Sequence, residues 1–144
     1  MDHKDGRVYL PTFAMKQSAS GLMDLPIEEE LYTSYATHEA SHTINQTLYA
    51  HECKMMPGAQ QEYLAYITQL STLKESTIKE VVDRFYGRKW TAFDTKNQIN
   101  PMMHAFNPQG FAVRSYLYHN VPEGSHLFKE FLQGIHRPVN LDGY

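Results

Sequence analysis

The sequence is poor in cysteine: Cys53 is the only one among 144 residues. A single cysteine excludes an internal disulfide, and its position in the polar segment His51-Glu52-Cys53-Lys54 predicts a free thiol rather than a metal ligand. The sequence also has no apolar run near the length of about 20 residues that spans a bilayer. Its first residues lack the pattern of a secretory signal. We therefore expect neither a disulfide framework nor a membrane span.

Positive charge is not in excess either. The chain has 13 Lys and Arg against 16 Asp and Glu, which gives a formal net charge of −3, and the basic residues form no run. This balance argues against nucleic acid as a partner. A length of 144 residues suits one hydrophobic core, so we expect a single domain over residues 1–144.

The sequence does contain the pattern H-E-x-x-H, formed by His38, Glu39 and His42. On a helix, an offset of four residues places both imidazoles on one face, where they can bind one Zn²⁺ while Glu39 reaches a water molecule beside it. Nothing from Ile27 to Tyr49 breaks a helix, and Asp24 is a candidate N-cap. The alternative is a helix that carries its two histidines as ordinary core residues.

A third ligand is predicted on the next helical segment, residues 59–70. Glu62 lies near the start of this segment and on its apolar side, where an unpaired carboxylate is costly and a metal ion would remove the cost. Ala65, one turn on, is small enough to let the two helices approach closely. The alternative is a solvated glutamate, favoured in the first turn by the helix dipole.

These residues resemble the gluzincin zinc metallopeptidases, in which H-E-x-x-H is followed by a helix with E-x-x-A, here Glu62 and Ala65. The resemblance covers about residues 24 to 73 and is nearest to the compact single-domain members of the family. It implies Zn²⁺ bound by His38, His42 and Glu62, with Glu39 as general base in peptide hydrolysis. A metzincin is a poorer match, because no Gly and third His follow His42 at the short spacing required.

The resemblance also implies a donor that stabilises the oxyanion of the transition state, which gluzincins supply from a Tyr or His downstream of the third ligand. Tyr116 and His119 are the candidates, three residues apart on one predicted helix face, and His104, placed in a predicted loop, is the third choice. Alternatively, Tyr116 belongs to the core and His119 interacts with the helix C-terminus.

The fold class that follows is mainly α (α+β): a zincin-like helical domain with an active-site helix, a Glu-bearing helix and a small N-terminal strand or hairpin. The strand candidates are residues 7–10 and 12–15. Further helices are expected from Ser76 to Gly87, from Pro108 to about His119, and after a break at residues 122–124 with Ser125 as N-cap. Residues 90–101 are expected to form a long loop.

The sequence thus predicts zinc-dependent hydrolysis of a peptide or protein substrate. Two alternatives stay open: a catalytically silent zinc-containing domain that binds a partner, and a metal-free helical interaction domain in which the motif is accidental. Glu39 argues against a silent site, which has no use for a base beside its ligands. A periplasmic or secreted location would follow if a leader and upstream strands have been removed, and a cytoplasmic location otherwise.

Overall fold

All regular elements that the structure describes are helices. The computed structural model describes residues 12, 21–50, 58–88, 101–133 and 135. Over these ranges the elements are the 3₁₀ turn η1 (Leu22–Asp24) and six α-helices: α2 (Glu29–Ala50), α3 (Gly58–Ser71), α4 (Glu75–Gly87), α5 (Pro101–Phe106), α6 (Pro108–His119) and α7 (Pro122–Leu132). The mainly helical fold class is therefore confirmed. Four predicted segments lie largely or wholly outside the described residues: the strand at 7–10, the strand at 12–15 apart from Thr12, the segment around Cys53 and the loop at 90–101 apart from Pro101.

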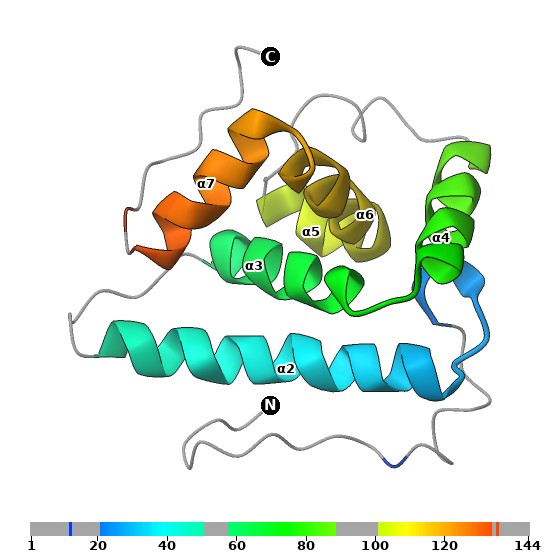
Figure 1. Ribbon diagram of the computed structural model, residues 1–144, viewed down its shortest axis with the longest axis horizontal. Coiled ribbons are helices and arrows are strands. Elements are labelled where there is room, and N and C mark those ends of the chain that lie inside the picture. The colour runs from blue at the N-terminus through cyan, green and yellow to red at the C-terminus, as the bar shows by residue number, and fades with distance from the viewer. Residues whose placement is uncertain (1–11, 13–20, 51–57, 89–100, 134, 136–144) are drawn as a thin grey trace.

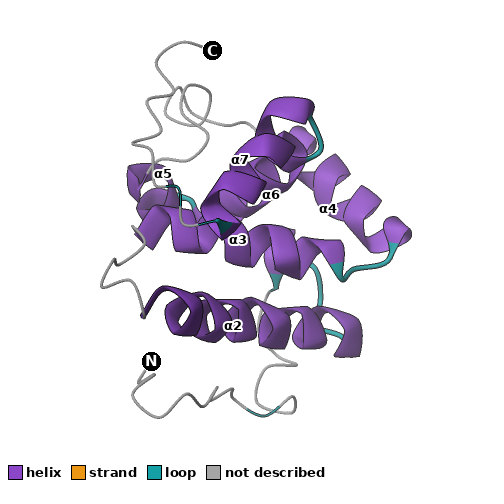
Figure 2. Ribbon diagram, turned by 60° about the vertical axis from the view of Figure 1, so that its left-hand side comes forward, coloured by secondary structure: helices purple, strands orange, loops and turns teal. Residues whose placement is uncertain are grey.

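Helix α3 lies in the middle of the fold. It runs antiparallel to the longer α2 on one side, and α5, α6 and α7 cover its other side (Figure 1). The turned view shows the same arrangement, with α3 between α2 and the remaining helices (Figure 2). Because α3 is covered from several sides, its buried residues are spread around the helix: Gln60, Tyr63, Leu64, Ala65, Ile67, Gln69 and Leu70.

Two groups of buried apolar side chains form the core. One group joins η1 and the start of α2 to the end of α3, to α4 and to α6, and includes Leu31, Leu70 and Phe85. The other joins the first part of α3 to α5, α6 and α7, and includes Tyr63, Phe111 and Phe131. Tyr66 packs against both groups.

The start of α2 differs from the prediction. The helix begins at Glu29, and Asp24 is not its N-cap but belongs to η1, where Met23 and Asp24 adopt positive φ values of 55° and 58°. Arg84 holds this turn by donating to the carbonyl oxygens of both residues, at 3.2 and 3.0 Å. The Asp24 carboxylate pairs with Arg88 at 2.6 Å. The local pattern assigned the Asp24 carboxylate to an N-cap, but this group instead forms a long-range ion pair with the residue that follows α4.

The start of α6 follows the prediction, whereas that of α7 does not. The Asn107 side chain accepts a hydrogen bond from the Gly110 backbone at 2.9 Å, and Pro108 occupies the first turn. In α7 the segment 122–124 is the first helical turn rather than a break, because Pro122 is tolerated at the first position. Ser125 is therefore inside the helix, and Leu132 at its end is 47% exposed.

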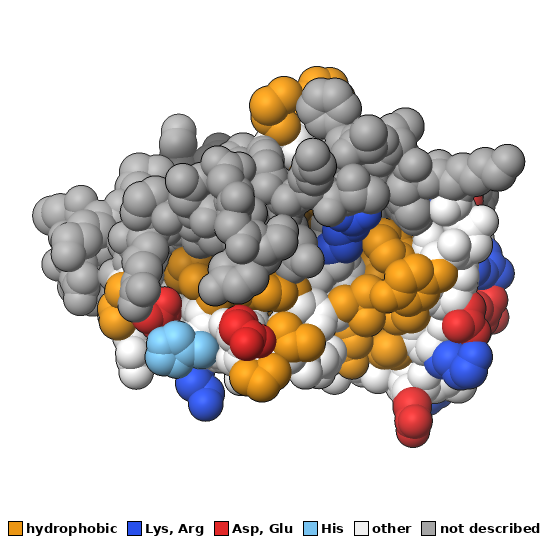
Figure 3. All heavy atoms as spheres, turned by 90° about the horizontal axis from the view of Figure 1, so that it is seen from above, with side chains coloured by type: hydrophobic (Ala, Val, Ile, Leu, Met, Phe, Trp, Pro, Cys, Tyr) orange, Lys and Arg blue, Asp and Glu red, His pale blue; other side chains and the backbone are white. Residues whose placement is uncertain are grey.

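The surface of the helical domain mixes apolar and charged side chains. Viewed from the side of α4 and α7, hydrophobic side chains reach the surface between acidic and basic ones (Figure 3). Among the described residues, no helix combines the length and apolar character that crossing a bilayer requires. Both observations agree with the sequence, which predicts no membrane-spanning helix.

Candidate metal centre

His38 and His42 lie one turn apart on α2, and the Nε2 atoms of both rings point toward each other. The two Nε2 atoms are 3.1 Å apart, and both residues are 8% exposed. The helix places them so because residues at i and i+4 share a face, and this face of α2 packs against α3. Two ring nitrogens are thereby brought together in a largely buried position.

Glu62 of α3 completes the group. Its Oε2 atom lies 3.4 Å from His38 Nε2, and its Oε1 atom lies 3.5 Å from His42 Nε2. One ligand atom from each of the three residues falls within 4.8 Å of the others. Tetrahedral zinc with bonds of about 2.0–2.1 Å requires donor atoms about 3.3–3.4 Å apart. The two imidazoles and the carboxylate therefore have the chemistry of a Zn²⁺ site and lie close enough together to hold the ion, each nitrogen facing a different carboxylate oxygen.

The surroundings of the group are aromatic and polar. The Tyr66 ring, one turn after Glu62 on α3, lies 4.5 Å from the His38 ring between centroids. Within the described part of the chain, the buried Nδ1 atom of His38 has no hydrogen-bond partner. The partner that usually orients a metal-binding imidazole is thus not seen for His38 among these residues.

The ionisation of Glu62 reflects its histidine neighbours. Burial raises the pKa of the carboxyl group, but the hydrogen bond from His38 and the charges of His42, His104 and His38 outweigh burial, so the pKa lies below its usual value. Burial, and then the negative charges of Glu62 and other neighbours, raise the pKa of the Tyr66 phenol. The site therefore holds an ionised carboxylate beside a neutral phenol, and the carboxylate is the form that ligates metal.

Glu39 lines the same pocket as His38, His42 and Glu62 but is not part of the group that could hold a metal ion. A pocket of about 340 Å³ is lined by the three ligands together with Glu39, Gln46, Gly58 and Gln61. Glu39 is half-buried, and its neighbour His38 is buried. A carboxylate in this position can exchange a proton with a water molecule or a substrate held in the pocket.

The structure adds a residue that the sequence pattern ranked low. His104 was placed in a predicted loop, but it lies on the short helix α5, and its Nε2 atom is 3.4 Å from Glu62 Oε2. The available signal was Pro101, which suits the first turn of a helix, with Asn107 ready to begin the next helix. Six residues are too few to show a helical period, so the pattern did not indicate α5.

Tyr116 and His119, the predicted oxyanion donors, have other contacts. Tyr116 packs against the core group that contains Leu31 and Phe85. The His119 ring lies 4.7 Å from the Phe128 ring of α7, and burial lowers the pKa of His119. Phe111, which contacts His104, precedes His119 by eight residues, about 12 Å along the axis of α6. The oxyanion role of this pair stays a prediction.

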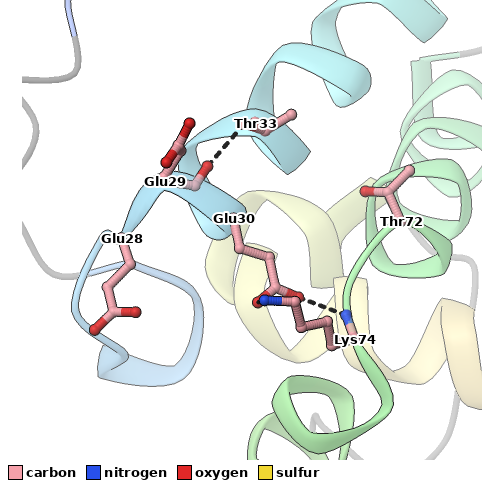
Figure 4. A pocket seen from close by; sticks show the side chains of 6 residues that line it. All are labelled: Glu28, Glu29, Glu30, Thr33, Thr72 and Lys74. Carbon is pink, nitrogen blue, oxygen red and sulfur yellow. Dashed lines mark hydrogen bonds and ion pairs between the residues drawn. The ribbon is translucent and has the colours of Figure 1, made fainter.

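A larger pocket, of about 460 Å³, lies at the beginning of α2 and is lined by glutamates, threonines and Lys74 (Figure 4). Glu30 points toward the start of α4, where it accepts hydrogen bonds from the Lys74 backbone and from Thr77 Oγ1. The backbone hydrogen bond from Lys74 is the main reason that the pKa of Glu30 is lowered. This carboxylate holds the start of α4, so the residues of the larger pocket have a structural role. No histidine is among the residues that line it.

Comparison with known proteins places the chain in a family but assigns no chemistry. The chain belongs to a family of unknown function, DUF6639, which it matches over residues 7–137. No curated protein and no solved structure matches the chain. The family match includes all six α-helices and the four residues of the candidate site, so the inference about function rests on the geometry of that site.

Proposed function

We propose that this protein is a zinc-dependent peptide hydrolase in which His38, His42 and Glu62 bind Zn²⁺ and Glu39 is the general base. One observation carries the proposal: three donor groups from two helices converge at separations of 3.1–3.5 Å beside a pocket that Glu39 also lines. Such convergence of two imidazoles and a carboxylate is typical of catalytic zinc sites, which use three protein ligands and keep one position open.

The side chains then have distinct tasks. When bound, Zn²⁺ supplies a Lewis acid and lowers the pKa of a water molecule to about 7. The Glu39 carboxylate would accept a proton from a water molecule in the pocket and return it to the leaving amine, which is general acid–base catalysis by one carboxylate. His38 and His42 must be neutral to bind the metal, so zinc affinity falls in acid.

Oxyanion stabilisation by Tyr116 or His119 is part of the proposal, but two other residues lie nearer to the ligands. The rings of Tyr66 and His104 contact His38 and Glu62 directly. A comparison of Tyr116→Phe and His119→Gln with the parent tests the original pair, since loss of an oxyanion donor lowers kcat by about 10²–10³-fold.

A second candidate is a catalytically silent zinc-containing domain that binds a partner. The observation in its favour is that the described part of the chain has no strand beside the pocket, and an exposed sheet edge is one common way to hold an extended peptide. Poor alignment of a substrate would leave a bound metal with little turnover.

Two glutamate substitutions distinguish the candidates. Glu39→Gln should keep the zinc and the fold and lose about 10²–10⁴-fold in cleavage of a mixed peptide library. Glu62→Gln should weaken zinc binding itself, because a neutral amide is a poorer ligand than a carboxylate. Glu28→Gln makes the same chemical change at the other pocket and should alter neither property.

The measurements are zinc content by elemental analysis and peptide cleavage for the parent and the three variants. A parent protein that holds well under half an equivalent of zinc after zinc is supplied would exclude the enzyme. If the parent and Glu39→Gln bind zinc and cleave equally, the cleavage comes from a contaminant and the domain binds rather than cuts. If Glu39→Gln loses zinc, the two glutamates have the opposite roles.

A further inference from the structure

Among the histidines that the structure describes, His104 is the one outside the predicted ligand set that approaches the candidate zinc site. It comes from α5, about 40 residues after Glu62 in the sequence, and its Nε2 atom lies 3.4 Å from Glu62 Oε2. The three-residue ligand group, whose atoms all lie within 4.8 Å of one another, does not include it. His104 therefore contacts the carboxylate without sharing the point on which the three ligands converge.

The ring of His104 is held in place by aromatic neighbours. Its centroid lies 5.3 Å from the Phe111 ring of α6 and 6.1 Å from the Tyr66 ring of α3. Phe111 is fully buried, and the His104 side chain is 31% exposed. Rings from two larger helices thus fix the direction in which the Nε2 atom points.

We propose that His104 is a positioning residue that holds the Glu62 carboxylate in the orientation that binds zinc. This inference rests on the proposed zinc site. In the neutral imidazole with its proton on Nε2, the ring is oriented to donate to Oε2, the oxygen that also faces His38, while Oε1 faces His42. The 3.4 Å separation slightly exceeds the usual N–H···O range of about 2.7–3.2 Å, so a shift of a few tenths of an ångström completes the bond.

Glu62 needs such a neighbour more than the two histidines do. His38 and His42 are one turn apart on the same helix and are 8% exposed, so the α2 backbone and the packing fix their relative position. Glu62 comes from the other helix on a flexible side chain that is 23% exposed. A contact from outside the ligand group restricts its rotamers, and loss of such a contact typically costs 10–100-fold in metal affinity.

A pair of substitutions separates the hydrogen bond from the packing of the ring. His104→Phe keeps an aromatic ring against Phe111 and Tyr66 but removes the donor. His104→Gln keeps a donor at about the position of Nε2 but removes the ring. His126 of α7 forms a comparable pair with Glu130, with 3.3 Å between Nε2 and Oε1, so His126→Phe is a matched control on another helix.

The readout is the zinc dissociation constant, measured by chelator competition on the intact chain at a pH of about 8, where free imidazoles are neutral. We expect His104→Phe to weaken zinc binding by about 10–100-fold. His104→Gln should stay within a few-fold of the parent, and His126→Phe should equal the parent. Circular dichroism and melting of the zinc-free proteins show whether each variant keeps the parent fold.

Several results would overturn the inference. If His104→Gln weakens zinc binding and His104→Phe does not, the packing of the ring rather than the hydrogen bond matters. If both variants keep the parent affinity, His104 does not act through Glu62, and a fall in kcat alone would then indicate contact with the substrate. A parent that binds no zinc would refute the proposed function itself, whereas a parent that binds zinc beside unaffected variants refutes only the role of His104.

Discussion

Zinc should stabilise the folded protein in a way that depends on its free concentration, because the proposed ligands come from two separate helices. His38 and His42 belong to α2 and Glu62 belongs to α3, so the ion bridges the two helices only when they are packed together. A ligand that binds only the folded state stabilises it by RT ln(1 + [L]/Kd). Above Kd, each tenfold rise in free zinc should add about 1.4 kcal/mol to the free energy of unfolding.

The corresponding thermal effect is large enough to measure. At free zinc about 100 times Kd, the added stability is about 2.7 kcal/mol. For a domain of this size, that free energy raises Tm by roughly 10 °C. The perturbation is a series of zinc buffers, and the free energy of unfolding is obtained at each zinc concentration from urea titrations followed by circular dichroism.

His42→Ala provides the test of the site. The variant loses a ligand, so its free energy of unfolding should be independent of free zinc over the range in which that of the parent rises. It also loses the contact between the His42 and His38 rings, whose centroids are 4.8 Å apart, and this loss lowers stability at every zinc concentration. The slope therefore measures metal binding, and the constant offset measures packing.

His126→Ala is the control, since His126 is a histidine of α7 that pairs with Glu130 outside the ligand group. It should keep the slope of the parent. Equal slopes for the parent and His42→Ala would show that zinc acts elsewhere in the chain. A flat line for a parent that binds one equivalent of zinc would show that the ion does not hold the two helices together.

Three further predictions concern packing and charge. Ala65 is fully buried on α3, so Ala65→Leu should cost about 1–3 kcal/mol in urea unfolding and weaken zinc binding by separating the helices. In Gly124→Ala, the new Cβ would lie 2.0 Å from the Tyr118 carbonyl oxygen, so this variant should be destabilised. In Gly58→Ala, the new Cβ meets no atom within 4 Å, so this control variant should be as stable as the parent or more stable. Burial lowers the pKa of His119. The neutral His119 ring therefore contributes stability above pH about 6.5, and this contribution is lost as the pH falls through the folded-state pKa. In urea unfolding at a series of pH values, His119→Phe should flatten that part of the pH–stability profile.

The local signals in the sequence predicted most of the helices. Helices α3 and α4 begin within a residue of their predicted starts, and α6 begins at the predicted Pro108, because apolar spacing, Gly87 and the Asn107 cap are properties of neighbouring residues. The same holds for the pairing of His38 with His42, which follows from helix geometry alone.

The errors occurred where a distant residue decides the structure. Arg84 of α4 and Arg88, the residue after its end, hold the turn that contains Asp24, so Asp24 does not cap α2. Pro122 is compatible with both a break and a first turn, and the packing of α7 against α6 and α3 selects the helix. The approach of His104 to Glu62 joins segments about 40 residues apart, and no local pattern contains that information.

The position of α3 relates the proposed zinc site, with ligands from α2 and α3, to the other described helices. Helix α3 packs against α2 on the side of the histidines, and its remaining sides contact α5, α6 and α7. Those three helices contribute no residue to the ligand group, yet Phe111 and Phe131 bury the apolar side chains that follow Glu62. Metal affinity depends on how precisely the third ligand is held. The outer helices therefore serve the site by fixing α3, and substitutions in their contacts with α3 should alter zinc affinity before they alter the pairing of His38 with His42.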